Sequence, residues 1–365
     1  NTSVIAYISG KISTTEWRLT TAVGQPAPDI VGSAVVSITR AYASLFAAEA
    51  GATDATHLNR TDLTTGGGFI LNLPCYYDTG ADTTAVTVTG YTTGPNNYIR
   101  VYTPYDTANE VNQTQRHDGK WDTGKYRLDV TDGGSLIIGE DYVRISGLQV
   151  EMNGAAAAGR RVLSITSTIN PTNNDIRLDT IIINLGASSL YYARGIDIQD
   201  TDANVSIWNT VVTNPPSFNS SVNSGIVTVG ANTIVYSSTL IAGTGGYGLR
   251  NSGSGTVTCK NVYSSDASGT LAYTGTIIMT TCASADTTGT LDNIAYNTTN
   301  FTNVTAGSED YHLPLGSALI NVGTNTSSDS APLNFTTDID GLVRGLPWDI
   351  GADEYGTVTP GVKFR

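Results

Sequence analysis

Cysteine and histidine are scarce in this sequence. The cysteines are widely spaced and allow at most one disulfide: Cys75, Cys259 and Cys282. Disulfide scaffolds and zinc sites instead need pairs or ligands at short, fixed intervals. The histidines are equally far apart: His57, His117 and His312. A histidine-rich metal centre or a Cys/His nucleophile pair therefore has little support, and we expect no cofactor.

Charged residues are also few, at 14% of the chain, and acidic side chains outnumber basic ones. The formal net charge is -13 at pH 7, and the 19 Lys and Arg residues form no run. Because phosphate recognition needs clustered Lys and Arg, we expect no nucleic-acid partner and a general repulsion from polyanions. The acidic surface is interpreted as a source of solubility.

Long apolar runs are missing as well, so no membrane span is expected. The sequence begins at Asn1 rather than Met, from which we expect that an upstream segment is removed on export. The expected location is extracellular, on a cell surface or in a virion. Asn-x-Ser/Thr triplets make glycosylation a further expectation, at Asn1, Asn59, Asn112, Asn204, Asn219, Asn297, Asn300, Asn303, Asn325 and Asn334.

Glycine and tyrosine are plentiful, with 39 and 19 residues, and Thr, Ser, Asn and Asp are visibly abundant. This composition favours many short strands joined by tight turns over a helical bundle. A short apolar strand, a polar turn residue and a second short strand recur at 143–150, 176–184, 205–213, 234–242, 257–265 and 277–285. Recurrence of one motif along the chain is typical of a solenoid.

Aligning the six copies predicts two inward columns and one corner column. Period-two alternation places on one buried face Val143, Ile176, Val205, Ile234, Val257 and Ile277, together with Ile145, Leu178, Ile207, Tyr236, Cys259 and Met279. The corner column comprises Gly147, Thr180, Asn209, Ser238, Asn261 and Thr281. A fainter strand series lies between the copies, at 162–166, 195–199, 225–229, 247–251 and 271–275. The predicted fold is an all-β, right-handed parallel β-helix.

The two ends of the chain depart from this repeat. Residues 1–36 hold two apolar runs, 3–10 and 29–38, and are predicted to be an N-terminal arm that pairs with a neighbouring molecule. Residues 37–97 are assigned to an N-terminal cap and the first coils, with a helix at 43–52 whose apolar face is Leu45, Phe46 and Ala48. The β-helix is expected over 98–300, and a C-terminal lid and tail over 301–365.

Four segments carry a resemblance to a known family: HDGKWDTGKYRLDV (117–130), EDYVRISGLQV (140–150), RGIDIQDTDANVSIWNTVV (194–212) and DIDGLVRGLPWDIGADEY (338–355). Over roughly residues 37–355 the chain resembles the right-handed parallel β-helix repeat proteins of bacterial surfaces, environmental sequences and phage structural proteins. The resemblance implies the fold. Because the same superfold serves pectate lyases, polysaccharide hydrolases and phage tailspikes, it implies a carbohydrate connection by analogy only.

Several acidic residues are candidates for chemistry. Asp197, Asp200 and Asp202 could supply paired carboxylates for glycoside hydrolysis, but a strand end and a turn are the simpler interpretation. Glu140 and Asp141 are interpreted as turn acids in the same way. A lyase would need an Arg or Lys base, for which Arg177 and Arg194 are available, beside a Ca²⁺-binding acid cluster. A Ca²⁺ site is conceivable, though turn acids are favoured, at Asp338, Asp340, Asp349, Asp353 and Glu354.

Aromatic side chains are the remaining candidates, because their flat faces stack on sugar rings: Trp121, Trp208, Tyr191 and Tyr192. Ordinary packing explains each of them equally well. No residue is assigned a catalytic, cofactor or metal role. The leading hypothesis is a non-enzymatic structural or adhesive protein that forms a homo-oligomer or polymer through its N-terminal arm. The alternatives are a polysaccharide lyase or glycosidase, and a glycan-binding module.

Overall fold

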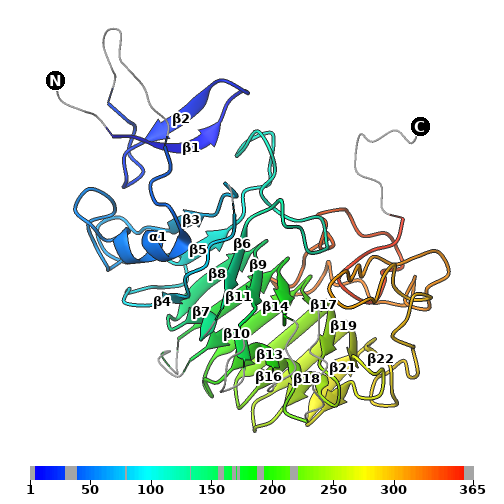
Figure 1. Cartoon of the computed structure of the whole chain (residues 1–365). Coiled ribbons are helices and arrows are strands. Elements are labelled where there is room, and N and C mark those ends of the chain that lie inside the picture. The colour runs from blue at the N-terminus through cyan, green and yellow to red at the C-terminus, as the bar shows by residue number, and fades with distance from the viewer. Residues whose placement is uncertain are drawn as a thin grey trace.

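Parallel strands dominate the regular structure of this chain (Figure 1). The computed structural model describes residues 5–28, 39–78, 80–131, 133–154, 160–166, 170, 173–186, 193–213 and 221–356. Within these residues the chain is nearly all β, with one α-helix, so the predicted all-β class is confirmed. That helix is too short to cross a membrane.

Strands of the first sheet come once per coil. This seven-stranded parallel sheet has the order β20-β18-β16-β13-β10-β7-β4. Its strands are β4 (Val86–Val88), β7 (Gly134–Ile138), β10 (Arg160–Ile165), β13 (Ala193–Ile198), β16 (Ser224–Thr228), β18 (Tyr247–Asn251) and β20 (Tyr273–Thr274). Each pairs with its counterpart in the next coil, so the sheet runs along the whole stack.

The second sheet bends at a corner and contains two strands of each coil. On one side of the corner are β3 (Leu71–Pro74), β5 (Ile99–Tyr102), β8 (Tyr142–Ser146), β11 (Asp175–Asp179), β14 (Asn204–Trp208) and β21 (Ile277–Thr280). On the other side are β6 (Arg127–Val130), β9 (Gln149–Met152), β12 (Ile182–Asn184), β15 (Val211–Thr213) and β22 (Ala283–Ser284). Two long strands run through the corner and join the sides: β17 (Asn232–Ala242) and β19 (Val257–Asp266).

Pairing between successive coils makes the architecture solenoid-like. Each strand pairs in parallel with the strand one coil further along, as β8 with β11 and β11 with β14. The coils therefore stack in chain order, which Figure 1 shows as a colour progression from cyan to yellow. The fold is thus an all-β stack with long parallel sheets, and both strand series expected from the sequence are present.

The inward columns confirm most of the predicted register. Val143, Ile176 and Val205 are aligned partners on adjacent strands and are buried. One coil was predicted wrongly, however: Val205 aligns with Thr233 and Ile207 with Val235, so Ile234 points outward. The reason is that a polar residue, Thr233, occupies the first inner position of this coil, so the apolar residues that follow it suggested a register shifted by one residue.

Three further members of the two predicted columns depart from the predicted burial in the core. Tyr236, predicted in the second column, lies on the outward face beside Lys260 instead. In the last coil Ile277 and Met279 are only half-buried against the core, because they lie on an edge strand with β19 as its described partner. The central coils are therefore the best packed part of the stack.

One residue at each corner adopts the left-handed backbone conformation. Positive φ angles occur at Gly147 (74°), Thr180 (53°), Asn209 (47°), Ser237 (42°), Asn261 (56°) and Thr281 (48°). The predicted corner column is confirmed except that Ser237, not Ser238, takes this role, which is the same shift of one residue seen in β17. Asn and Gly tolerate this conformation, whereas Thr and Ser adopt it only where neighbouring coils impose it.

The N-terminal region holds a hairpin and the helix. Strands β1 (Tyr7–Lys11) and β2 (Trp17–Thr20) pair antiparallel, and the apolar run 29–38 lies outside the described residues. Helix α1 (Leu45–Gly51) begins after Ser44, whose hydroxyl accepts the backbone N–H of Ala47. Its buried face contacts β3 and β4, but Phe46 is exposed, contrary to the prediction.

The C-terminal segment lies along the flank of the stack (Figure 1). Its apolar residues form a second core against outward side chains of β12, β15, β17, β19 and β22. The members from the C-terminal segment are Phe301, Tyr311, Leu313, Leu319, Ile339, Ile350 and Ala352. This part of the predicted lid thus packs on a side face of the solenoid.

The revised register of β17 gives the first testable prediction. Val235→Asp places a carboxylate in the fully buried inner column, so the variant should lose more than about 4 kcal/mol of unfolding free energy or fail to fold. Ile234→Asp, one residue away on the outward face, should cost far less. Thermal unfolding followed by circular dichroism checks both, and equal losses in the two variants would contradict the register.

Candidate functional site

A groove lies between the outward face of the stack and two covering segments. Strands β5, β8, β11 and β14 form its floor, the loop between β5 and β6 forms one wall, and the turn 337–341 forms the other. The cavity has a volume of about 340 Å³. It is lined by Tyr98, Arg100, Tyr105, Arg116, Arg144, Ser146, Asp179, Thr180, Trp208, Asn209, Thr337, Asp338 and Gly341.

A chain of polar contacts crosses the floor of the groove. Arg116 donates from Nη2 to the hydroxyl of Ser146 at 3.0 Å, and this hydroxyl donates to Oδ2 of Asp179 at 2.9 Å. Thr180 donates to the same carboxylate oxygen at 3.3 Å. Burial holds the pKa of Asp179 above its usual value, although the charge of Arg116 opposes this effect. The loop arginine is thereby attached to two strands of the stack.

Arginine side chains in the groove lie over aromatic rings. The guanidinium carbon of Arg116 is 4.0 Å from the centroid of Tyr105, and that of Arg144 is 4.9 Å from Tyr98. Arg100 lies 3.8 Å over Tyr102, its neighbour along β5. Such stacking fixes the plane of a guanidinium. Arg116 also donates from Nε to the hydroxyl of Thr103 and from Nη2 to its carbonyl, both at 3.5 Å, whereas among the described residues no side-chain hydrogen bond engages Arg100.

Three arginines and two carboxylates line the groove: Arg100, Arg116 and Arg144, with Asp179 and Asp338. Arg144 is neutralised by Asp175, with Nη2 and Oδ2 2.9 Å apart. No described carboxylate forms an ion pair with Arg100 or Arg116, and Asp179 interacts with Arg116 through Ser146. The arrangement can therefore bind an anion, and its aromatic edges can contact the apolar face of a sugar ring.

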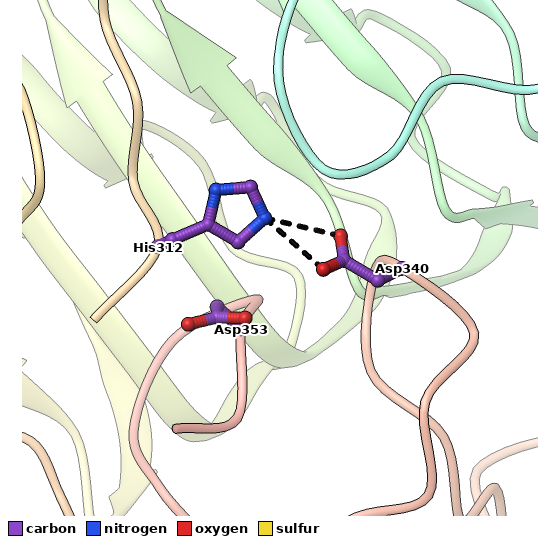
Figure 2. A group of neighbouring side chains, drawn as sticks. All are labelled: His312, Asp340 and Asp353. Carbon is purple, nitrogen blue, oxygen red and sulfur yellow. Dashed lines mark hydrogen bonds and ion pairs between the residues drawn. The ribbon is translucent and has the colours of Figure 1, made fainter. Parts of the chain in front are cut away.

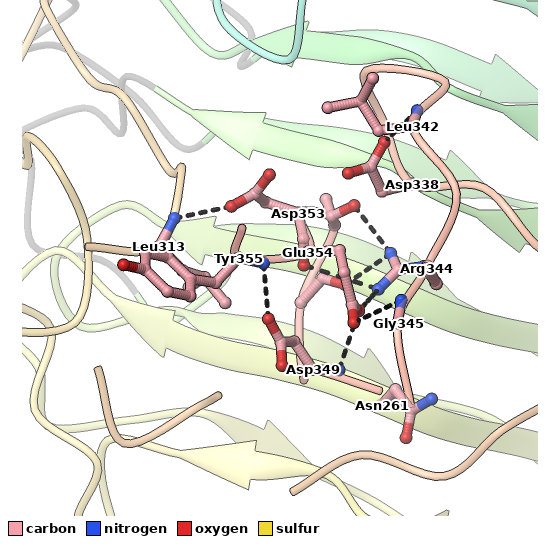
Figure 3. Close-up of polar contacts among 12 residues, drawn as sticks. Asn261, Leu313, Asp338, Leu342, Arg344, Gly345, Asp349, Asp353, Glu354 and Tyr355 are labelled. Atoms are coloured by element: carbon pink, nitrogen blue, oxygen red, sulfur yellow. Dashed lines mark hydrogen bonds and ion pairs between the residues drawn. The ribbon is translucent and has the colours of Figure 1, made fainter. Parts of the chain in front are cut away.

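Hydrogen bonds within the C-terminal segment, and between it and the stack, fix the turn 337–341 that forms the second wall of the groove (Figure 3). Asn209, at the corner after β14, donates to the carbonyl of Thr337 at 2.8 Å and accepts from Arg344 at 3.2 Å. Arg344 is fully buried and also pairs with Glu354 at 3.2 Å. Oδ1 of Asp338 accepts the backbone N–H groups of Asp340 and Leu342, which closes the turn.

Beside this turn, His312 contacts two carboxylates, of which Figure 2 shows Asp340. Its Nδ1 bonds Asp310, and its Nε2 lies 3.0 Å from Oδ2 of Asp340. Burial lowers the pKa of His312, but the hydrogen bonds to Asp310 and Asp340 outweigh it and raise the pKa to about 11. A β-carbon at Gly119 would lie 2.7 Å from this Nε2, so only glycine fits there.

The same cluster could offer ligands to a divalent cation. One ligand atom each from His312, Asp340 and Asp353 lie within 4.8 Å of one another. In the structure His312 pairs with Asp340, and Asp353 accepts the N–H of Leu313 at 2.7 Å. Two other acids named for Ca²⁺, Asp349 and Glu354, accept backbone N–H groups from Asn321, Tyr355, Gly345 and Asp349. These two fit the turn interpretation better than a metal site.

The acids proposed for hydrolysis do not form a catalytic pair. Asp197 points outward from β13, as expected, but it is fully buried and paired with Arg161 at 2.7 Å and Arg194 at 3.1 Å. These ion pairs give Asp197 a structural role in the packing of adjacent strands. Oδ1 of Asp200 accepts the N–H of Asp202, which is a turn contact.

The remaining acids and bases named from the sequence have structural contacts. Glu140 accepts the N–H of Tyr91 at 2.6 Å, and Asp141 accepts that of Asn170. Arg177 pairs with Asp175 at 2.6 Å, the carboxylate that also neutralises Arg144. These residues support turns and strand edges rather than a lyase site.

Of the aromatic candidates within the described residues, Trp208 lines the groove. Trp208 is half-buried and stacks on Phe335, with ring centroids 6.2 Å apart and an interplanar angle of 16°. Trp121 packs against the second core instead. Tyr191 and Tyr192 lie outside the described residues.

Sequence reasoning missed the groove residues Arg100, Arg116, Arg144 and Asp179. The signal for three of them was available, because the outward positions two residues apart in the repeats include Arg100, Arg144 and Asp179. Arg116 comes from a loop outside the repeat, so no periodicity marks it. Comparison with known proteins found no matching family model, no similar curated protein and no similar solved structure.

His117 holds the loop that carries Arg116. Its Nδ1 accepts the N–H of Gly119 at 3.2 Å, so its Nε2–H donates to the carbonyl of Thr180 at 2.9 Å. Both nitrogens are engaged only if the ring is neutral. Burial lowers the pKa of His117 to about 3, in agreement with this geometry.

The neutral ring makes stability depend on pH. The pKa of His117 is lower in the folded protein than its value of 6.5 in the unfolded chain. This group therefore contributes stability above pH 6.5, and that stability is lost as the pH falls toward 3. Between pH 6.5 and about 5, the wild type should lose about 2 kcal/mol through this group. His117→Gln keeps both hydrogen bonds and should remove this loss, as measured by urea unfolding at each pH.

A histidine added elsewhere in the loop serves as the control. Gln113 is exposed, so Gln113→His should leave the wild-type pH dependence unchanged. If the free energy of unfolding of His117→Gln falls with decreasing pH as steeply as that of the wild type, the imidazole of His117 accepts a proton in the folded state.

Proposed function

We propose that this protein is a non-enzymatic, extracellular adhesive or structural module that binds an acidic polysaccharide in the groove between β5, β8, β11, β14 and the turn 337–341. The observation that carries the proposal is the presence of Arg100 and Arg116, held over aromatic rings without a directly paired carboxylate. Arginine binds sugar carboxylates in a bidentate manner, and the neighbouring rings of Tyr105 and Trp208 suit the faces of pyranose rings.

The fold assignment within this proposal is a right-handed parallel β-helix of the repeat family named above. Parallel strands joined by crossovers within one sheet are right-handed in about 98% of cases, which supports this handedness. A stack of this kind presents a long rigid face, and an adhesive protein needs such a face to follow a polymer. The location on a cell surface, in the extracellular medium or in a virion is part of the same proposal.

Self-association through the N-terminal hairpin is the second part of the proposed function. Ile8 and Leu19 are cross-strand neighbours and are both largely exposed, at 42% and 45%. The hairpin also contacts its own chain, since Lys11 donates to the carbonyl of Asn109 at 2.7 Å and Tyr7 to that of Thr56 at 3.2 Å. These contacts fix the base of the hairpin and leave an apolar pair for a second copy.

One observation favours an enzymatic alternative. Asp179 and Asp338 both line the groove, and burial, aided by the charge of Asp340, raises the pKa of Asp338 to about 7. Two carboxyl groups of this kind could serve as acid and base toward a bound glycan. Release of reducing sugars or of unsaturated products, abolished by Asp179→Asn, would establish this alternative.

Binding of polygalacturonate tests the leading proposal. Arg100→Ala removes an unpaired guanidinium from the groove and should weaken binding roughly tenfold or more, because a charge-assisted hydrogen bond contributes about 1.5–3 kcal/mol. Arg250→Ala, in the other sheet, should bind as the wild type does. Isothermal titration calorimetry measures both. A neutral glucan that binds equally well, or equal affinities of the two variants, would argue against an anionic ligand.

Association is tested by charging the exposed pair of the hairpin. Ile8→Asp combined with Leu19→Asp should convert an oligomer to a monomer with little change in melting temperature, because both side chains face solvent in a single copy. The control is Ile278→Asp, at a position 57% exposed on β21. Light scattering after size exclusion reports the mass. An unchanged mass in the double variant would show that the hairpin contacts only its own chain.

A further inference from the structure

Two cysteines meet in the interior of the last coils. Cys259 lies in the inner column of β19, and Cys282 follows the corner residue Thr281 in the next coil. Both side chains are fully buried in the main core. Their sulfur atoms are 2.8 Å apart, less than about 1 Å beyond the length of a covalent S–S bond.

The third cysteine has no part in this arrangement. Cys75 follows β3, at the opposite end of the stack, and its thiol contacts the carbonyl of Leu73 at 3.6 Å. Several strands separate β3 from β19 in the sheet order. Among the three cysteines the fold therefore allows one pairing, Cys259 with Cys282.

We propose that Cys259 and Cys282 form a disulfide that ties the last coil to the one before it. Formation removes a proton from each thiol and transfers two electrons to an external disulfide, which leaves as two thiols. Because both sulfur atoms are fully buried after folding, the exchange takes place before the last coil docks. The oxidant is a small disulfide or a dithiol oxidoreductase, as found in oxidising compartments.

A disulfide stabilises the last coil most, because few other contacts hold this coil in place. Strands β20 and β22 contain two residues each, and Ile277 and Met279 of β21 are only half-buried. Cys282 donates its N–H to the hydroxyl of Thr290 at 2.7 Å, and Tyr273 donates to the carbonyl of Ala283 at 3.0 Å. These bonds add to the pairing of β21 and β22 with β19. A covalent bond to β19 would stop this coil from opening separately and exposing the end of the core.

The test counts thiols in the full-length chain. Reduced, denatured protein is refolded in a buffer of glutathione and glutathione disulfide, freed of both, denatured again and labelled with an alkylating reagent. The expected product carries one label, on Cys75, and peptide mapping finds Cys259 joined to Cys282. Three labels, or a bridge that includes Cys75, would overturn the proposal. If the chain does not refold, the same count is made on protein exported to a bacterial periplasm.

Matched variants separate the bond from the packing of the sulfur atoms. Cys75→Ala should carry no label after oxidation, and Cys259→Ala should carry two. In the wild type, the melting temperature should be several degrees lower when the protein is folded with reductant present. Cys282→Ala should melt at the same temperature with and without reductant. A wild type that shows no such difference, while carrying the bridge, would overturn the stabilising role.

Discussion

The left-handed backbone at each corner is the constraint on which the rest of the structure depends. At these corners one strand turns into the next within a single residue that takes a positive φ, as Asn209 and Asn261 do. The turned peptides then present polar groups at the same place in every coil. His117 donates to Thr180, Thr337 accepts from Asn209, and Thr324 accepts from Asn261. The covering segments are therefore attached along one line of the solenoid.

This attachment also shapes the groove. The strands supply Arg100, Arg144 and Asp179 at fixed spacing, because adjacent coils pair in register. The loop supplies Arg116, whose position depends on its bond to Ser146 and on the neutral ring of His117 next to it. A rigid floor with walls anchored at the corners is suited to binding without large rearrangement.

The sequence predicted the repeat well because the repeat is a local pattern. Alternation of apolar residues and a recurring polar turn residue are visible without any knowledge of tertiary contacts, so the columns through Val143, Ile176 and Val205 were correct. The pattern failed in β17, because the true inner residue, Val235, has an apolar residue on each side, Ile234 and Tyr236. It also could not show that Asp197 is paired, because Arg161 belongs to another coil.

The candidate site was harder to predict, because it joins segments far apart in the chain. Asn209 and Thr337 are 128 residues apart, and no periodicity connects them. The net charge of -13 also predicted repulsion from polyanions, yet it is a sum over the whole surface. At physiological salt the Debye length is about 8 Å, so a ligand in the groove is influenced mainly by the charges that line it. The arginines and the two carboxylates that line the groove then set the local field, and the distant carboxylates act mostly on the rate of approach at low salt.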